Sequence, residues 1–592
     1  SRTMLRVGFF LFGILCLSGL SAKTNVVVFL TDDQGWGDLS LNGNTNLSTP
    51  NIDSLAKEGA SFDRFYVCPV CSPTRAEFLT GRHHVRSGVY STSAGGERMD
   101  LDETTIADLF KQAGYATGAF GKWHNGMQYP YHPLGRGFDY FYGFCSGHWG
   151  HYYDALMERN GKLVQGKGFC VDDFTTEAMN FIDRSVAKKQ PFFTYIPYNT
   201  PHSPMQVPDR WWKKFKSRKL EDMMRNRNPK KEDRLHLLAA LAMCENIDWN
   251  VGRLLNKLDE LEVTDDTIVV FFHDNGPNGV RWNGDMEGRK GSTEEGGTRS
   301  PLLIKWPKGI KAGTKVMQIA SVRDLLPTLT ELAGVKDKSK KAIDGKSLKT
   351  LLSGNTKGWK SRTLVSTWKG KLGVRDQRFR LGYKGKLFDM KNDPGQRVDV
   401  SKQFPKVTER LNQRKQSFQK KVLDKAGLDT RPFVIGHPAV SWTQIPARDG
   451  TAHGGIKRSN KFPNCSYFTN WMSKEDFITW DVEVGKSGKY EVELWYACPE
   501  QDLGAEIELS FSGNSLVTTI STPNDPPLVG KQEDRSPRME SYVKDFKPMT
   551  MGVIELTEGT GIMKLQATQI PKSQAMEFRL LQLTRIKEKG TD

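Results

Sequence analysis

Cys71 begins a short segment in which proline follows two places on and arginine four places on, as Pro73 and Arg75. Proline suits a first helical turn, and the apolar residues after Arg75 precede Gly81, so the pattern predicts a helix that begins near residue 71. The free N–H groups and the dipole at a helix N-terminus favour a bound anion. Cys68 lacks this spacing, so the sequence singles out residue 71 as the candidate reactive position.

Four apolar, strand-like segments end in side chains that could bind a metal or move protons. They are followed by Asp32 and Asp33, by Lys122 and His124, by His202, and by Asp274 and Asn275. Because ligands of open parallel sheets bind outside the carboxyl ends of the strands, we expect these side chains to share one crevice. Adjacent carboxylates repel unless a cation neutralises them, and oxygen ligands suit calcium or magnesium better than zinc.

The elements that must position these residues alternate between strands and helices from Asn25 to about Val335. Alternation of this kind predicts an α/β fold with a largely parallel sheet and helices on both faces. Short β segments and a helix from Pro405 to Ala426 follow, and from about Pro432 the chain reads as a separate β-sandwich. We therefore expect domains at 23–360, 361–430 and 431–592.

The net charge of the protein limits the kinds of molecule that it is expected to bind. The 592 residues include 85 Lys and Arg against 68 Asp and Glu, a formal net charge of +17. A basic surface suits a polyanion, either nucleic acid or a sulfated polysaccharide. The sequence has no zinc-finger spacing, RNA-binding aromatic motif or basic-region heptad, so we expect no nucleic-acid partner.

The N-terminus reads as a secretory signal peptide over residues 1–22, with residues 1–3 before the apparent start at Met4. Its apolar stretch is too short for a comfortable membrane span and ends in small residues. We therefore expect a secreted or periplasmic protein without integral membrane association. Export permits disulfides, and although spacing does not identify pairs, Cys465 with Cys498 is the first pair to test.

The Cys71 motif, the strand-end residues and Lys290 in a glycine-rich segment together resemble type I sulfatases, the formylglycine-dependent branch of the alkaline phosphatase superfamily. The resemblance covers about Asn25 to Val400 and implies an alkaline-phosphatase-like sandwich with a small C-terminal antiparallel subdomain. It implies that a maturation enzyme oxidises Cys71 to formylglycine (3-oxoalanine). It also implies one calcium ion, with magnesium as the alternative, held by Asp32, Asp33, residue 71, Asp274 and Asn275.

The resemblance further implies a mechanism in which the aldehyde hydrate at residue 71 attacks sulfur with the help of Asp274 and forms a covalent sulfo-enzyme intermediate. In this mechanism His202 protonates the leaving alcohol, and His124 then deprotonates the second hydroxyl to expel sulfate. The catalytic residues it assigns are Cys71, Arg75, Lys122, His124, His202 and Lys290.

The sequence indicates the substrate less closely than it indicates the reaction. Export, basic charge and the appended sandwich favour a sulfated carbohydrate, and His148, His151 and Arg86 are rim candidates for binding it. The aromatic loop from Cys145 to Asp154 either stacks on sugar rings or packs internally. Two alternatives stay open: a phosphoesterase or phosphonate hydrolase of the same superfamily, and a non-catalytic sulfated-glycan-binding protein with unmodified Cys71. Whether the sandwich binds carbohydrate or braces the catalytic domain is equally open.

Overall fold

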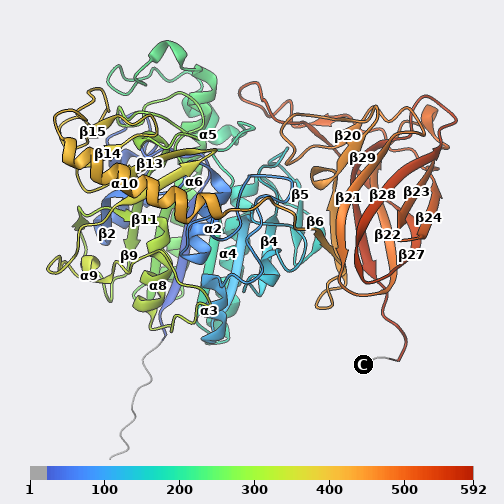
Figure 1. The fold of residues 1–592 in the computed structure, drawn as a ribbon, viewed down its shortest axis with the longest axis horizontal. Helices are drawn as coiled ribbons and strands as arrows, with labels where there is room; N and C mark the ends of the chain where they lie inside the picture. The colour runs from blue at the N-terminus through green and yellow to red at the C-terminus, as the bar shows by residue number, and fades with distance from the viewer. Residues whose placement is uncertain (1–22, 591–592) are drawn as a thin grey trace, which may run out of the picture.

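A computed structural model describes residues 23–590, so the expected signal peptide lies outside the described residues. Figure 1 shows two adjoining parts, a mixed α/β part drawn from blue to yellow and a β-sandwich in orange and red. Orange-red loops cross between the two parts at the top of this view. Within residues 23–590, no helix is both long enough and apolar enough to cross a membrane.

The α/β part is built on a mixed sheet with strand order β10-β2-β9-β8-β1-β7-β3-β4-β5-β6, and β11 pairs with β2. The neighbouring strands β8, β1, β7, β3 and β4 are parallel, whereas β9 runs antiparallel to β8 and β2. The strands are β1 (Asn25–Thr31), β2 (Ala60–Tyr66), β3 (Ala116–Lys122), β4 (Tyr140–Phe144), β5 (Leu156–Arg159), β6 (Lys162–Gln165), β7 (Phe192–Pro197), β8 (Thr267–His273), β9 (Arg299–Lys305), β10 (Thr314–Val316) and β11 (Ala320–Ser321).

Helices cover both faces of this sheet, as the alternation predicts. Val27 and Phe29 of β1 pack with α1, α4 and α6, whereas Val26 and Val28 face α2, α3 and α8 on the other side. An apolar run buried on both faces is typical of a central parallel strand. The helices are α1 (Pro50–Glu58), α2 (Cys71–Thr80), α3 (Ile106–Gln112), α4 (Cys170–Ala187), α5 (Asp209–Phe215), α6 (Arg234–Glu260), α7 (Glu295–Thr298), α8 (Leu325–Ala333) and α9 (Lys349–Leu352).

A small antiparallel sheet follows, in the order β12-β13-β14-β15. The helix α10 (Pro405–Lys421) packs on it through Leu411 and Phe418. The helix ends five residues before the predicted Ala426, and the sequence pattern did not indicate β13. The strands are β12 (Leu364–Trp368), β13 (Lys371–Arg375), β14 (Phe379–Leu381) and β15 (Leu387–Asp389).

The C-terminal part contains two six-stranded sheets that enclose one core, with Trp480, Tyr490 and Leu581 in it, and a separate two-stranded sheet of β25 (Leu528–Val529) and β26 (Val543–Lys544). Its pairings are antiparallel apart from that of β16 with β21. One sheet holds β16 (Phe433–Ile435), β18 (Thr451–His453), β21 (Phe477–Val484), β28 (Gly559–Gln569), β23 (Glu506–Phe511) and β24 (Asn514–Thr519). The other holds β17 (Trp442–Pro446), β19 (Lys457–Arg458), β20 (Phe468–Thr469), β29 (Glu577–Arg585), β22 (Gly488–Ala497) and β27 (Lys547–Leu556).

The fold class is as expected. The first cysteine pair to test, Cys465 with Cys498, does not form a disulfide in this structure. Cys465 and Cys498 are both buried free thiols. The Sγ atom of Cys465 lies 3.5 Å from the carbonyl of Ser541, and that of Cys498 lies 3.6 Å from the carbonyl of Ala575. Each thiol therefore has its own backbone acceptor. We propose domain boundaries at residues 360 and 430 because the small sheet and the sandwich each enclose a separate core.

Candidate active site

Four neighbouring parallel strands, in the order β8-β1-β7-β3, end at the same edge of the central sheet. Asp32 and Asp33 follow β1, Lys122 closes β3, His202 lies in the loop after β7, and Asp274 follows β8. The parallel register brings these ends level, since Thr31 pairs with His273 and Leu30 with Pro197. The strand-end residues therefore lie together at this edge, the position at which the sequence predicts a crevice.

Residue 71 faces this crevice from the N-terminus of α2. Its Sγ atom lies within 4.8 Å of carboxylate oxygens of Asp32 and Asp274. The helix is fully buried, and the Thr74 hydroxyl donates a 2.5 Å hydrogen bond to the carbonyl of Asp274, which ties α2 to the end of β8. Burial raises the pKa of the Cys71 thiol, although the Lys122 ammonium opposes this shift. An unmodified cysteine here stays protonated and is a poor nucleophile.

Two buried carboxylates on this edge are paired with buried cations. Nζ of Lys122 lies 2.7 Å from Oδ2 of Asp32, and Nη2 of Arg75 lies 3.0 Å from Oδ2 of Asp274. Burial opposes ionisation of Asp32, but Lys122 and the other cations outweigh it and keep its pKa below the usual range. Burial, with the negative charge of Asp32, raises the pKa of Asp274 to about 8.

Asp33 is the third buried carboxylate. Nζ of Lys290 lies 2.8 Å from its Oδ1 atom, the Asn275 amide donates to it at 2.9 Å, and Nε2 of His202 lies 3.7 Å from its Oδ2 atom. Burial opposes ionisation, yet Lys290 and His202 lower the pKa of Asp33. Three carboxylates thus face the three cations Arg75, Lys122 and Lys290.

The carboxylate and amide oxygens at this edge of the sheet fit a hard divalent cation. Among the described residues, Oδ1 of Asp32 and Oδ1 of Asn275 are buried without a hydrogen-bond partner. Unpartnered buried oxygens are costly unless something binds them. Carboxylate and amide oxygens are the ligands that calcium and magnesium prefer. A divalent cation and a sulfate dianion together also leave the charge balance of the site unchanged.

The two histidines have defined tautomers because each meets a carbonyl, which only accepts hydrogen bonds. Nε2 of His124 donates to the carbonyl of Thr92 at 2.6 Å, so Nδ1 keeps its lone pair and is buried without a partner in the described residues. Burial lowers the pKa of His124 well below its ordinary value. Nδ1 of His202 donates to the carbonyl of Ser203 at 2.6 Å, which leaves Nε2 facing the crevice near Asp33.

The three candidate substrate-binding residues lie at different places in the structure. His148 is buried and stacks on His202 at a ring distance of 5.6 Å, so it lies at the site. His151 lies 4.0 Å from Glu533 of the sandwich, beyond the crevice. Arg86 is not brought to the site: its Nε atom lies 3.7 Å from Asp344. The reason is that α2, about 15 Å long at 1.5 Å per residue, carries the chain away from Cys71 before Arg86 is reached.

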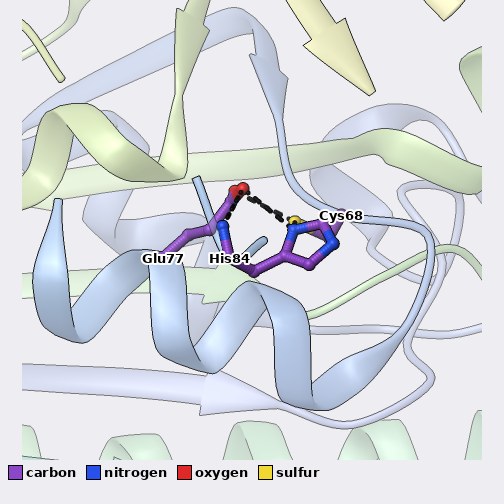
Figure 2. A group of neighbouring side chains, drawn as sticks. All are labelled: Cys68, Glu77 and His84. Carbon is purple, nitrogen blue, oxygen red and sulfur yellow. Dashed lines mark hydrogen bonds and ion pairs between the residues drawn. The ribbon is translucent and has the colours of Figure 1, made fainter. Parts of the chain in front are cut away.

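A second cluster of metal-binding residue types, drawn in Figure 2, lies along the same helix. Sγ of Cys68 donates to Oε2 of Glu77 at 2.9 Å, and Nδ1 of His84 lies 3.2 Å from Oε1. Arg323 already neutralises Glu77 at 2.8 Å. Burial raises the pKa of Cys68, with Glu77 adding to the effect, so the thiol is neutral. The cluster is satisfied without an ion and braces α2.

Three residues at the site escaped the sequence analysis. Thr74 lies inside the recognised motif, where its role in tying α2 to Asp274 follows only from the fold. Asn464 accepts from the Ser146 hydroxyl and donates to the same Thr92 carbonyl that receives His124. The Glu540 carboxylate accepts a hydrogen bond from the Ser203 hydroxyl, next to His202. Asn464 and Glu540 belong to the sandwich, and no local pattern marks them.

Known proteins are similar to this chain in sequence and in fold. The family model described as "Sulfatase" matches residues 24–335, and the model "N-sulphoglucosamine sulphohydrolase, C-terminal" matches residues 290–421. Mouse N-acetylgalactosamine-6-sulfatase is 33% identical over 375 residues, which cover 57% of this chain and 68% of that protein. The human protein of the same name is also 33% identical, over 372 residues. The crystal structure of Ps i-CgsB with k-i-k-neocarrahexaose has a TM-score of 0.61 and 31% identity, covering 67% of this chain and 92% of that one.

Fold and site together define an enzyme of the alkaline phosphatase superfamily, a sulfuric ester hydrolase. More particularly, the chain belongs to the sulfatase family and is a type I sulfatase. The resemblance inferred from the Cys71 motif is therefore confirmed.

Proposed function

We propose that this protein is a secreted or periplasmic sulfatase that hydrolyses sulfate esters of a sulfated carbohydrate, either a polysaccharide or its oligosaccharides. The observation on which this proposal rests is residue 71 at a buried helix N-terminus, against three carboxylates and three cations. Relatives named for N-acetylgalactosamine 6-sulfate and a structure with a neocarrahexaose support the carbohydrate. So does the net charge of +17.

Residue 71 is the proposed nucleophile, converted to formylglycine by a maturation enzyme. The hydrated aldehyde supplies a hydroxyl for attack on sulfur and a second hydroxyl for release of sulfate. Asp274 lies close enough to residue 71 to accept the proton of the attacking hydroxyl. The N-terminus of α2, Lys122 and Lys290 point positive charge at the same crevice, where they stabilise the sulfate oxygens.

We propose Asp32, Asp33, residue 71, Asp274 and Asn275 as the residues that hold one calcium ion, with magnesium as the alternative. The ion would supply positive charge at the sulfate oxygens. Chelation is expected to lower sulfate release at least tenfold and to lower the thermal midpoint, because a ligand at 100 times its Kd stabilises a protein by about 2.7 kcal/mol. Activity and melting curves after chelation, with calcium or magnesium added back, test this. Full activity in a verified metal-free sample would contradict it.

His124 and His202 divide the proton transfers in this proposal. His124 has a free Nδ1 lone pair, and burial lowers its pKa so that the ring is unprotonated and can accept a proton. His202 keeps one proton on Nδ1, against the Ser203 carbonyl, and turns its Nε2 towards Asp33. As the imidazolium it carries a second proton on Nε2, which is the proton proposed to pass to the leaving alcohol.

Replacing His202 with glutamine is therefore expected to depend on the leaving group. Turnover of a sugar sulfate should fall about 100-fold or more, since general acid catalysis contributes 10²–10⁴-fold. Turnover of 4-nitrophenyl sulfate should fall less than about tenfold, because its phenolate needs no proton to leave. Steady-state kinetics on both esters measure the ratio. Equal losses on the two esters would contradict the acid role.

The proposed substrate class is tested by measuring sulfate release across defined sulfated oligosaccharides, with the matching phosphate esters as controls. We expect release from at least one sulfated oligosaccharide and much slower release from the phosphate esters. Turnover of aryl sulfates alone would contradict the carbohydrate proposal, although not the family. Preferred phosphate-ester turnover would instead favour the phosphoesterase alternative.

A further inference from the structure

A segment of the sandwich reaches back onto the catalytic part. This segment, residues 528–544, runs between β25 (Leu528–Val529) and β26 (Val543–Lys544), and we call it the arm. The Arg535 amide donates to the carbonyl of Met205 at 2.9 Å, and its guanidinium donates to the carbonyl of Val207 at 2.8 Å. Arg538 donates to the carbonyl of Gly150 at 2.8 Å. The arm is thus fixed to the two loops that present His202 and His148.

A cavity of about 310 Å³ lies between the arm and the catalytic part. Lys231, His236 and Arg289 line one side, and Met539 and Glu540 of the arm line the other. This volume is at the lower end for small-ligand pockets, which begin near about 300 Å³.

Two residues that line the cavity are direct sequence neighbours of proposed catalytic residues. Ser203, which lines it, follows His202 directly and donates its hydroxyl to Glu540. Arg289, which also lines it, precedes Lys290, whose Nζ atom binds Asp33. A sugar chain whose sulfate ester reaches residue 71 therefore has this cavity beside it.

The lining combines the cations Lys231 and Arg289 with the carboxylates of Asp233 and Glu540, so it offers partners both to an anionic group and to sugar hydroxyls. Lys231 and Arg289 are exposed, and neither forms an ion pair within the described part of the chain. Glu540 accepts from the Ser203 hydroxyl through Oε1 and from the Met539 amide through Oε2, and each carboxylate oxygen keeps a second lone pair for a sugar hydroxyl. Met539 is 67% exposed and offers an apolar surface to a sugar face. Burial lowers the pKa of His236 to about 4, so its ring is neutral and suits a hydroxyl.

We propose that this cavity is a subsite for the sugar next to the sulfated one, and that it selects a neighbour that itself carries a sulfate or carboxylate. The proposal rests on the proposed carbohydrate sulfatase function and specifies its substrate. It also gives the sandwich a role, since Met539 and Glu540 come from the arm. Lys231 and Arg289 bind the anionic group, and the arm closes over the ring.

The test compares a double variant, Lys231→Ala with Arg289→Ala, with the double variant Lys213→Ala with Lys230→Ala. The control removes the same charge from exposed lysines that do not line the cavity. The substrates are an anionic oligosaccharide found by sulfate release and the sulfated monosaccharide from its reacting end. The ratio of their kcat/KM values should fall about tenfold or more in the test variant, through KM, because charge-assisted hydrogen bonds are lost. The control variant should have the same ratio as the wild-type enzyme.

A Met539→Ala variant is a second probe that leaves the charge of the protein unchanged. It should lower the same ratio by about threefold or more, since an apolar contact to the sugar is lost. An unchanged ratio in both test variants, or equal losses on the oligosaccharide and the monosaccharide, would overturn the subsite.

A failure of the proposed function can be distinguished from a failure of the subsite. If the wild-type enzyme releases no sulfate from any carbohydrate, the proposed function is wrong. Binding of k-i-k-neocarrahexaose to the Cys71→Ala variant still tests the cavity, by calorimetry with and without Lys231→Ala and Arg289→Ala. A Kd raised at least tenfold supports the subsite, and an unchanged Kd or no binding overturns it.

Discussion

Replacing Cys71 with alanine is expected to reduce sulfate release at least about 1,000-fold in kcat while the protein stays folded. Removal of a catalytic nucleophile commonly costs more than this. The fold should persist because the Sγ atom forms no disulfide and the helix is anchored by Thr74. Steady-state kinetics and thermal melting measure the two effects.

Cys71→Ser separates the aldehyde from a simple hydroxyl nucleophile. Serine supplies one hydroxyl and no second one to expel sulfate, so turnover should stop after one event at most. The matched control is Cys68→Ala, which removes a thiol three residues away that faces Glu77 and not the crevice. Turnover close to wild type in either Cys71 variant refutes the nucleophile assignment.

Replacing Arg75 with alanine is expected to abolish activity and to destabilise the fold by about 3–5 kcal/mol, because breaking a buried ion pair leaves an uncompensated charge. Arg75 is fully buried between Asp274 and the carbonyl of Lys122. The loss is visible as a lower midpoint in denaturant unfolding.

Arg64→Ala is the matched control. Arg64 pairs with Asp63 at 3.2 Å on the surface, where such pairs contribute about 0–1 kcal/mol. Arg75→Lys tests geometry, since lysine keeps the charge but loses the planar fork that contacts two groups at once. Wild-type stability and turnover in Arg75→Ala would show that the guanidinium is dispensable.

Much of the fold could be predicted from the sequence because the central strands are buried on both faces. Runs such as Asn25 to Leu30 have few non-strand interpretations, and their polar ends mark the carboxyl edge of the sheet. The helix at Cys71 was also predictable, since Pro73 and Gly81 mark its two ends. These signals are local in the chain.

The contacts that depend on distant packing could not be predicted. Asn464 and Glu540 reach the catalytic loops from more than 250 residues away, and neither lies in a motif. Arg86 follows the motif closely, yet α2 carries it towards Asp344. Cys465 and Cys498 are buried cysteines in an apparently exported chain, but only the fold shows that their thiols face different carbonyls.

The most direct test of the central claim is mass spectrometry of the peptide from Phe65 to Arg75, which trypsin releases after Arg64 and Arg75. The peptide contains both Cys68 and Cys71, so alkylation of the unfolded protein provides an internal control. An active sample is predicted to carry one alkylated cysteine, at residue 68, and at residue 71 an aldehyde that is lighter than cysteine and reacts with a hydrazide. Two alkylated cysteines throughout a sample with full sulfatase turnover would contradict the formylglycine account.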